Sequence, residues 1–343
     1  MDLVLIWAGL IAISVFLYVV LDGFDLGVGI LFPFVKDDRE RDQMIASIAP
    51  VWDGNETWLI LGGGGLLAVF PLAYSALMPA LYLPVLVMLI ALIFRGVAFE
   101  FRHHGAARGR PFWSNAFFGG SLAAALSQGL ILGGFVQGVA IDPATGAYAG
   151  GPFDWLTPFS LLTAVGVAAG YALLGAAWLV FKTEGPLHTR AQAWTPRLAV
   201  GVGAAMFAVS AATLTVDPQV TQRWGVSLAR GVYDLDRFLA LAWLPALGLG
   251  CIAAIVYSAP RRPHRRAYQF AVALFGLSFL GLGISLWPYA TPFGLTIYEA
   301  AAAPNALALM LAGAAVILPM ILGYTAFVYW VFRAKVAPDA SYH

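Results

Sequence analysis

Charge and cysteine are both scarce in this sequence. Only 11% of its 343 residues are charged, 61% are hydrophobic, and the mean hydropathy is +0.81. Soluble domains carry about 25% charged and about 45–50% apolar residues, so a water-soluble globular protein and a disordered chain are excluded. The formal net charge of +1 provides no basic surface, so we expect no nucleic-acid partner. The single cysteine, Cys251, excludes an intramolecular disulfide and a cysteine-based metal centre.

Histidine is absent from the long apolar runs. All five histidines lie in polar stretches between these runs or in the C-terminal tail: His103, His104, His188, His264 and His343. Haem needs an axial His, Met, Cys or Tyr ligand, so we expect this chain to ligate no haem through a membrane-embedded histidine. The adjacent His103 and His104 are interpreted as part of a basic loop, and no metal site is expected.

Nine apolar runs are long enough to cross a bilayer as helices, which takes roughly 20 residues. They are approximately Leu3–Phe34, Met44–Phe70, Met78–Phe101, Asn115–Gln137, Thr157–Phe181, Leu198–Val216, Leu239–Ala259, Phe270–Tyr289 and Asn305–Phe332. The second run is interrupted by polar residues between Trp52 and Thr57 and by Gly62–Gly65, so by itself it could be re-entrant. The sequence predicts an all-α, polytopic membrane protein with one integral-membrane domain over residues 1–343.

Lysine and arginine predict how these spans are oriented. If the N-terminus is outside and the spans alternate, fifteen Lys and Arg fall on the cytoplasmic side, and only three fall outside, all within Asp217–Arg237. Omitting the second span would reverse every later loop and remove this asymmetry. The positive-inside rule therefore favours nine helices with a periplasmic N-terminus and a cytoplasmic C-terminus. No basic stretch precedes the first span and no cleavage site follows it, so we expect it to be retained.

Ionisable residues inside the predicted spans are the main functional signal, because each costs about 2.5–3.5 kcal/mol on insertion scales. Those within spans are Asp22, Asp25, Asp53, Glu56 and Arg95, and Glu100 lies near a span end. The rise of an α-helix places the charges of three different spans at similar depths, roughly 9–16 Å from their cytoplasmic ends. A random distribution would not place them together.

Four acids in these spans face one arginine, which leaves excess negative charge in a low dielectric. Such surroundings favour carboxyls that are protonated or exchange protons. We therefore expect a proton-uptake path from the cytoplasm that includes Asp22, Asp25 and Asp53.

A buried charge network of Glu56, Arg95 and Glu100 is expected beside this path. For these three residues, a second interpretation is equally open. In it, Arg95 and two acids form a salt-bridge cluster that only holds the first three spans together.

Five segments together carry a family resemblance: Leu21–Gly29 (LDGFDLGVG), Ser47–Trp58 (SIAPVWDGNETW), Phe94–Arg102 (FRGVAFEFR), Leu295–Ala301 (LTIYEAA) and Tyr324–Arg333 (YTAFVYWVFR). With them, the chain resembles subunit II of the cytochrome bd-type quinol oxidases, including the cyanide-insensitive branch. The predicted length and topology agree, so the resemblance covers the whole chain.

This resemblance implies a heterodimer in the bacterial cytoplasmic (inner) membrane with a larger, similarly folded subunit I. That partner would hold haem b and haem d, or haem b alone. The complex would oxidise ubiquinol or menaquinol and reduce oxygen to water, taking protons from the cytoplasm, so that a proton gradient forms without pumping. Asp22 and Asp53 match acidic positions proposed for proton delivery, and Asp25 matches the first motif.

The rest of the chain would be a scaffold that ligates no haem and has room for a structural quinone or a lipid. A small single-helix accessory subunit is a further partner that the resemblance allows. Two alternatives remain from the residues: a stand-alone proton-coupled transporter, and a subunit needed only for assembly. The transporter is disfavoured because the buried acids concentrate in the first three spans, whereas inverted repeats would place polar breaks in both halves.

Overall fold

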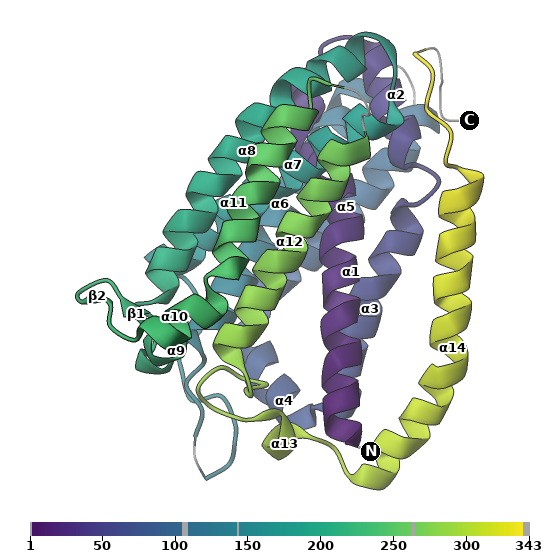
Figure 1. Cartoon of the computed structure of the whole chain (residues 1–343). Helices are drawn as coiled ribbons and strands as arrows, with labels where there is room; N and C mark the ends of the chain where they lie inside the picture. Colours follow the sequence, from purple (N-terminus) through teal and green to yellow (C-terminus); the bar gives the residue numbers. More distant parts are fainter. Residues whose placement is uncertain (1, 105–108, 143, 262–264, 339–343) are drawn as a thin grey trace.

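The computed structural model describes residues 2–104, 109–142, 144–261 and 265–338, which form a bundle of long helices (Figure 1). Arg108, Arg262, His264 and His343, and the side chains of His103 and His104, lie outside the described part. The helices of ten or more residues are α1 (Leu3–Leu31), α2 (Asp38–Ile48), α3 (Trp52–Val69), α4 (Pro71–Ala80), α5 (Tyr82–His104), α6 (Arg110–Gln137), α7 (Pro158–Lys182), α8 (Gly185–Thr213), α11 (Trp243–Ser258), α12 (Arg265–Leu286) and α14 (Pro304–Val331).

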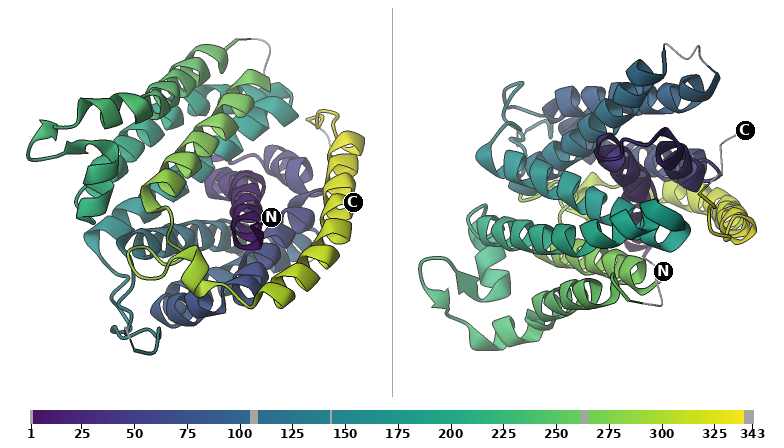
Figure 2. Two further views of the ribbon diagram at one scale, coloured as in Figure 1. Left: turned by 60° about the horizontal axis from the view of Figure 1, so that its bottom comes forward. Right: turned by 90° about the horizontal axis from the view of Figure 1, so that it is seen from above.

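Short elements connect the long helices. They are η1 (Phe32–Phe34), α9 (Pro218–Trp224), β1 (Val226–Ser227), β2 (Gly231–Val232), α10 (Leu235–Leu241) and α13 (Ile297–Ala300). The chain is mostly helical, as expected, and β1 and β2 add one antiparallel pair of two residues each. Figures 1 and 2 show this pair projecting sideways beside α9 and α10, away from the centre of the bundle.

Eight stretches of helix within the described residues are long and apolar enough to cross a membrane. α3 is not among them, because its polar first turns and the run Gly62–Gly65 lower its hydropathy. The second predicted run is also divided: α2 ends at Ile48 and α3 begins at Trp52. Pro50, which has no N–H to donate, lies in the break between them.

For three other predicted runs, the boundaries differ from those of the helices in the structure. The run from Met78 begins in α4 and continues in α5, with a turn at Leu81 between the two helices. The run from Leu198 is the second part of α8, and the run from Leu239 combines the end of α10 with α11. An apolar run reports which residues avoid water, whereas a helix continues as far as its backbone hydrogen bonds are formed, so the two boundaries need not agree.

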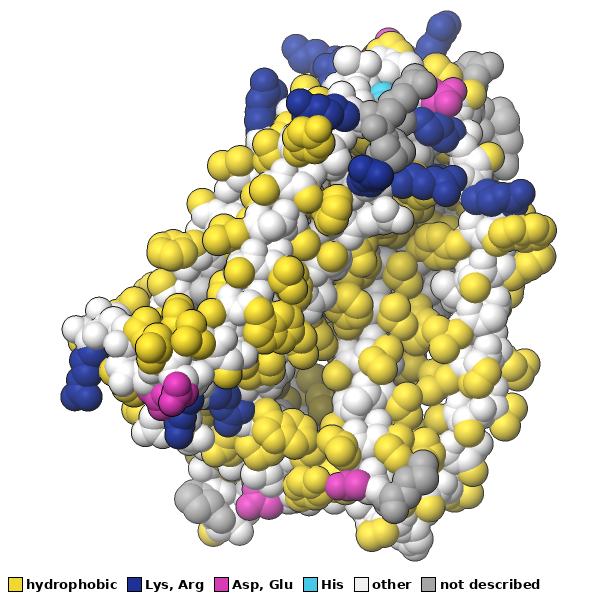
Figure 3. All heavy atoms as spheres, in the orientation of Figure 1, with side chains coloured by type: hydrophobic (Ala, Val, Ile, Leu, Met, Phe, Trp, Pro, Cys, Tyr) yellow, Lys and Arg dark blue, Asp and Glu magenta, His cyan; other side chains and the backbone are white. Residues whose placement is uncertain are grey.

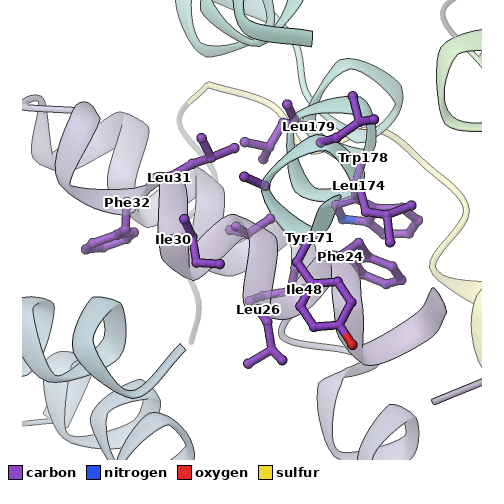
Figure 4. Packing of buried hydrophobic residues seen from close by; sticks show 14 of the residues in the cluster. Phe24, Leu26, Ile30, Leu31, Phe32, Ile48, Tyr171, Leu174, Trp178 and Leu179 are labelled. Carbon is purple, nitrogen blue, oxygen red and sulfur yellow. The ribbon is translucent and has the colours of Figure 1, made fainter. Parts of the chain in front are cut away.

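The packed centre of the bundle lies between α1 and α7. Of the residues in the most apolar part of α7, 72% are buried. The Phe24 ring of α1 stacks on the Trp178 ring of α7, with centroids 4.0 Å apart, and Figure 4 shows these side chains among the buried apolar residues. A Cβ atom added to Gly27 would overlap the carbonyl oxygen of Tyr171. Glycine is therefore what allows these two backbones to approach each other closely.

Helix α14 stands apart from this centre and is attached at its two ends (Figures 1 and 2). At one end the Trp7 indole donates to the carbonyl of Leu307 at 3.0 Å. At the other end the Lys182 ammonium donates to the carbonyls of Phe332 and, at 2.8 Å, Ala334. Only 6% of the residues in the most apolar part of α14 are buried. Figure 3 shows apolar side chains on both sides of the hollow between α14 and the rest of the bundle.

Candidate functional site: a buried charge cluster between α1, α3 and α5

Arg95 is the centre of the buried cluster. This residue of α5 is only 2% exposed, and its Nη1 lies 2.9 Å from Asp22 Oδ1 of α1. Its Nη2 pairs with Glu56 of α3, and its guanidinium lies 5.6 Å from the centroid of the Trp52 ring. The guanidinium therefore links three helices.

Close packing between α5 and α6 positions this arginine. A Cβ atom added to Gly120 of α6 would lie 2.7 Å from the carbonyl oxygen of Ala91 and 3.0 Å from the backbone nitrogen of Arg95. The backbone of Arg95 thus lies directly against α6 at a glycine. Its side chain extends toward α1 and α3, where the acids are.

Asp25 lies one turn after Asp22 on α1, and neither residue is exposed at all. Its Oδ2 accepts a hydrogen bond of 2.7 Å from the Asn55 side-chain amide of α3. The same amide nitrogen donates to the carbonyl of Leu21 at 3.3 Å, and Asn55 Oδ1 accepts from the Tyr329 hydroxyl of α14 at 2.9 Å. Asn55 therefore connects α14 to the carboxyls of α1.

A second polar chain reaches the cluster from α6 and α7. The Tyr171 hydroxyl donates to Gln128 Oε1 at 2.5 Å, and Gln128 Nε2 donates to the Tyr18 hydroxyl at 2.7 Å. Tyr18 lies one turn before Asp22 on α1 and interacts with its carboxyl. All three residues of this chain are buried.

Five polar residues around the cluster were not predicted from the sequence: Tyr18, Asn55, Gln128, Tyr171 and Tyr329. One signal was available for Gln128, because an amide in an otherwise apolar span needs a buried partner. Asn55 stands between two of the predicted acids. The tyrosines gave no signal, because tyrosine is common at the ends of membrane spans.

Asp53 and Glu100 are placed differently from the expectation. Both are exposed, in contrast to the buried position expected for Glu100. They directly follow Trp52 of α3 and Phe99 of α5, whose ring centroids are 5.4 Å apart. The two carboxyl residues therefore lie on the outer side of two neighbouring helices, and the buried cluster contains three acids rather than four.

Glu56 lies between the buried acids and the outer side. Its side chain is 26% exposed, compared with none for Asp22, and both are paired with Arg95. The structure thus brings together Asp22, Asp25, Glu56 and Arg95, with Glu56 as their most exposed member.

The side chains of the cluster are carboxyls, amides, phenols and one guanidinium. None of them is an imidazole, thiolate or thioether, and the hydroxyls of the three tyrosines hydrogen-bond to the amides of Gln128 and Asn55. Within the described residues, no group of three or more His, Cys, Asp and Glu is arranged to hold a metal ion. Groups of this kind can bind, stabilise and exchange protons.

Comparison with known proteins agrees with the motifs in these helices. A family model for cytochrome bd terminal oxidase subunit II matches residues 3–332. The chain belongs to the cytochrome bd subunit II family. It is similar to the cytochrome bd-I ubiquinol oxidase subunit 2 of Escherichia coli (strain K12), with 31% identity over 366 residues that cover 97% of this chain and 95% of the relative.

Two further proteins are similar to this chain, one in sequence and one in fold. The cytochrome bd ubiquinol oxidase subunit 2 of Bacillus subtilis (strain 168) is 28% identical over 343 residues, covering 97% of this chain and 96% of the relative. The structure of bd oxidase from Geobacillus thermodenitrificans has a similar fold, with a TM-score of 0.74 and 18% identity over 96% of this chain and 99% of that chain.

Membership of the cytochrome bd subunit II family establishes the general role of the chain. It is a multi-pass protein of the bacterial inner membrane and a subunit of a haem-containing oxidoreductase complex in aerobic respiration. A subunit II implies a subunit I partner. The alternative of a stand-alone transporter is therefore set aside.

Proposed function

We propose that this chain conducts protons from the cytoplasm toward the haems of subunit I, while that partner oxidises quinol and reduces oxygen to water. Charge is separated without a pump, because protons are taken up on one side of the membrane and released on the other side. The relatives that are named as ubiquinol oxidases support a quinol substrate. The observation that carries the proposal is the position of Asp53 and Glu100, on the outer side of membrane helices and beside the buried cluster.

Exposed carboxyls at membrane depth need a protein partner. Hydrocarbon cannot solvate a carboxylate, so acids in spans face the interior of a complex or a water-filled cavity. Asp53, Gly54 and Thr57 all lie exposed on the first turns of α3, and Glu100 is exposed on α5. We propose that subunit I covers this face and that the proton path runs along the interface, with Asp22 and Asp25 behind it.

The same proposal includes nine crossings in one integral-membrane domain, with a periplasmic N-terminus and a cytoplasmic C-terminus. α3 is the additional crossing, because its exposed polar side would be covered by subunit I rather than by lipid. Lys and Arg gather at the end of the bundle where the C-terminus lies (Figure 3), which supports a cytoplasmic position for that end.

Cofactors and further partners follow from the family role. We propose that subunit I holds haem b and haem d, or haem b alone, and that this chain ligates none of them. The apolar hollow beside α14 is suited to a structural quinone or a lipid. A single-helix accessory subunit could bind the complex elsewhere.

The test replaces Asp53 with asparagine in the whole complex. Asp53→Asn should leave the complex assembled and haem-loaded but slow oxygen consumption with quinol several-fold, because a proton-accepting group is lost. Asp236→Asn is the matched control, since Asp236 is also exposed but lies on the short helix α10. Normal turnover in a correctly assembled Asp53→Asn complex would refute the proton-path role of this residue.

A further inference from the structure

The three acids of the buried cluster differ in what they contact. Asp22 and Glu56 both pair with Arg95, whereas the direct partner of Asp25 is the neutral amide of Asn55. A guanidinium stabilises a carboxylate by charge as well as by hydrogen bonding, and an amide does so only by hydrogen bonding. The surroundings of Asp25 thus stabilise a negative charge least.

The orientation of the Asn55 amide is determined by its neighbours. The carbonyl of Leu21 can only accept, so the Asn55 atom 3.3 Å away must be the nitrogen. That nitrogen donates to Asp25 Oδ2, and the opposite oxygen accepts from Tyr329. Oδ2 of Asp25 is therefore an acceptor. Its Oδ1 has no hydrogen-bond partner among the side chains and backbone groups that the structure describes.

The surroundings of Asp22, in contrast to those of Asp25, stabilise a negative charge. The Tyr18 hydroxyl oxygen accepts from Gln128 at 2.7 Å, so its own hydrogen is not used in that bond, and Asp22 lies one turn further along α1. Tyr171 donates to the other end of the Gln128 amide and so holds it in this orientation. Asp22 Oδ1 lies 2.9 Å from the guanidinium of Arg95, so Asp22 has a cation directly beside it, whereas Asp25 has the neutral amide of Asn55.

A charge count separates the two residues further. Ionising all three acids around one guanidinium would leave two uncompensated negative charges in a buried site, and one such charge remains if Asp25 is neutral. Among the residues that the structure describes, the other ionisable groups that face Asp25 are Tyr268 of α12 and Tyr329 of α14, and neither brings a positive charge. Buried charge without a partner is strongly unfavourable, so the neutral form of Asp25 is the less costly arrangement.

We propose that Asp25 holds a proton on Oδ1, that Asp22 is the permanently ionised partner of Arg95, and that Tyr329 is a positioning residue that orients Asn55 against Asp25. The use of this proton during turnover rests on the proposed function. The protonation state itself does not depend on it, and it can be measured in the resting complex.

Infrared spectra of the purified haem-loaded complex in H2O and in D2O test this assignment. A protonated carboxyl has a carbonyl stretching band that shifts in D2O, and a carboxylate has no such band. The difference between the native complex and Asp25→Asn should contain this band. The difference between the native complex and Asp22→Asn should contain only carboxylate bands, or Asp22→Asn should fail to assemble because Arg95 loses its partner.

Three results would overturn the proposal. One is a spectrum in which Asp25→Asn removes no protonated-carboxyl band, and another is an assembled Asp22→Asn complex that lacks the band. The third is failure of Asp25→Asn to assemble, because asparagine has the shape of a neutral aspartic acid. Tyr329→Phe should move the band without removing it, and an unmoved band would refute the positioning role of Tyr329.

The outcome is independent of the Asp53→Asn turnover test. Normal turnover with Asn at position 53, together with a lost band in Asp25→Asn, would refute the proton path and leave the protonation of Asp25 standing. Slow turnover in Asp53→Asn, together with an unchanged band in Asp25→Asn, would support the proton path and refute the protonation of Asp25.

Discussion

Two segments of the molecule are both rich in aspartate and glycine, yet they have opposite surroundings. In Asp22–Gly29 of α1 every residue is buried. In Asp53–Gly65 of α3, the aspartate and three of the glycines, Gly54, Gly63 and Gly64, are exposed. The same residue types therefore occur in the packed centre of the bundle and on its outer side.

The glycines show what this difference means. At Gly27 a Cβ atom would overlap the backbone of α7, whereas at Gly63 no heavy atom outside the local helix lies within 4 Å of the added atom. Glycine in α1 allows contact within the chain. Glycine in α3 leaves a smooth outer face, which is suited to close approach by a helix of another chain. Substitutions in and around these two segments test the difference between them.

The largest effect is expected for Arg95→Gln. Removing the guanidinium leaves two acids in the cluster without their cation, and breaking a buried pair in this way destabilises by about 3–5 kcal/mol. We expect little assembled complex, measured by size-exclusion chromatography and haem content. Arg230→Gln, at an exposed arginine, is the control and should assemble normally. Normal yield and thermal stability of the Arg95→Gln complex would show that the cluster does not stabilise the bundle.

A smaller effect is expected for Gly27→Ala. The added methyl group must displace either α1 or α7, and overpacking of this kind destabilises by about 1–3 kcal/mol. The melting temperature of this chain in detergent should fall, while that of Gly63→Ala should stay unchanged. In the complete complex, Gly63→Ala should weaken the association with subunit I. Equal effects of the two substitutions in both measurements would contradict the comparison.

Tyr171→Phe should have a modest effect on stability. It removes the hydroxyl that donates to Gln128 and leaves a buried amide oxygen unpaired. Leaving such a group unpaired lowers the free energy of unfolding by about 1–3 kcal/mol. Tyr324→Phe is the matched control, because Tyr324 is 68% exposed on α14. The difference between the two melting temperatures measures the contribution of the polar chain, and a difference of zero would exclude such a contribution.

The smallest effect is expected for Asp2, an exposed acid at the N-terminal end of α1, far along this helix from Asp22 and Asp25. The Leu5 backbone N–H donates to Asp2 at 3.1 Å and the Tyr298 hydroxyl at 2.8 Å, and both lower the pKa of Asp2 below its usual value of 3.8. Because the pKa is lower in the folded state, this stabilisation is complete above about pH 4 and is lost as the pH falls further.

Hydrogen exchange at the Leu5 amide should therefore accelerate below about pH 4 beyond its intrinsic pH dependence. Asp2→Asn should abolish this additional acceleration, and an unchanged acceleration in that variant would assign the effect to another group. Because Asp2 is exposed, the bundle as a whole should stay folded throughout.

Much of the fold follows directly from the sequence. Long apolar runs must form helices in a membrane, because every backbone N–H and C=O group there needs a partner within its own segment. The scarce charges likewise predicted that Arg95 in a span meets acids, and Glu56 of the expected network does pair with it. These conclusions depend only on solvation, which composition and spacing express. The pairing of Arg95 with Asp22 was not predicted, because Asp22 was assigned to the proton path.

The direction in which each helix faces was decided by tertiary structure alone. Asp53 and Glu56 are three residues apart and share one face of α3, yet the first is exposed and the second reaches Arg95. The rotation of α3 is set after the break at Pro50, by packing on α1 and by the contact between Trp52 and Phe99. The link from Tyr329 to Asn55 joins residues 274 positions apart. Only the folded bundle brings such residues together, because local spacing does not encode how one helix is turned against another.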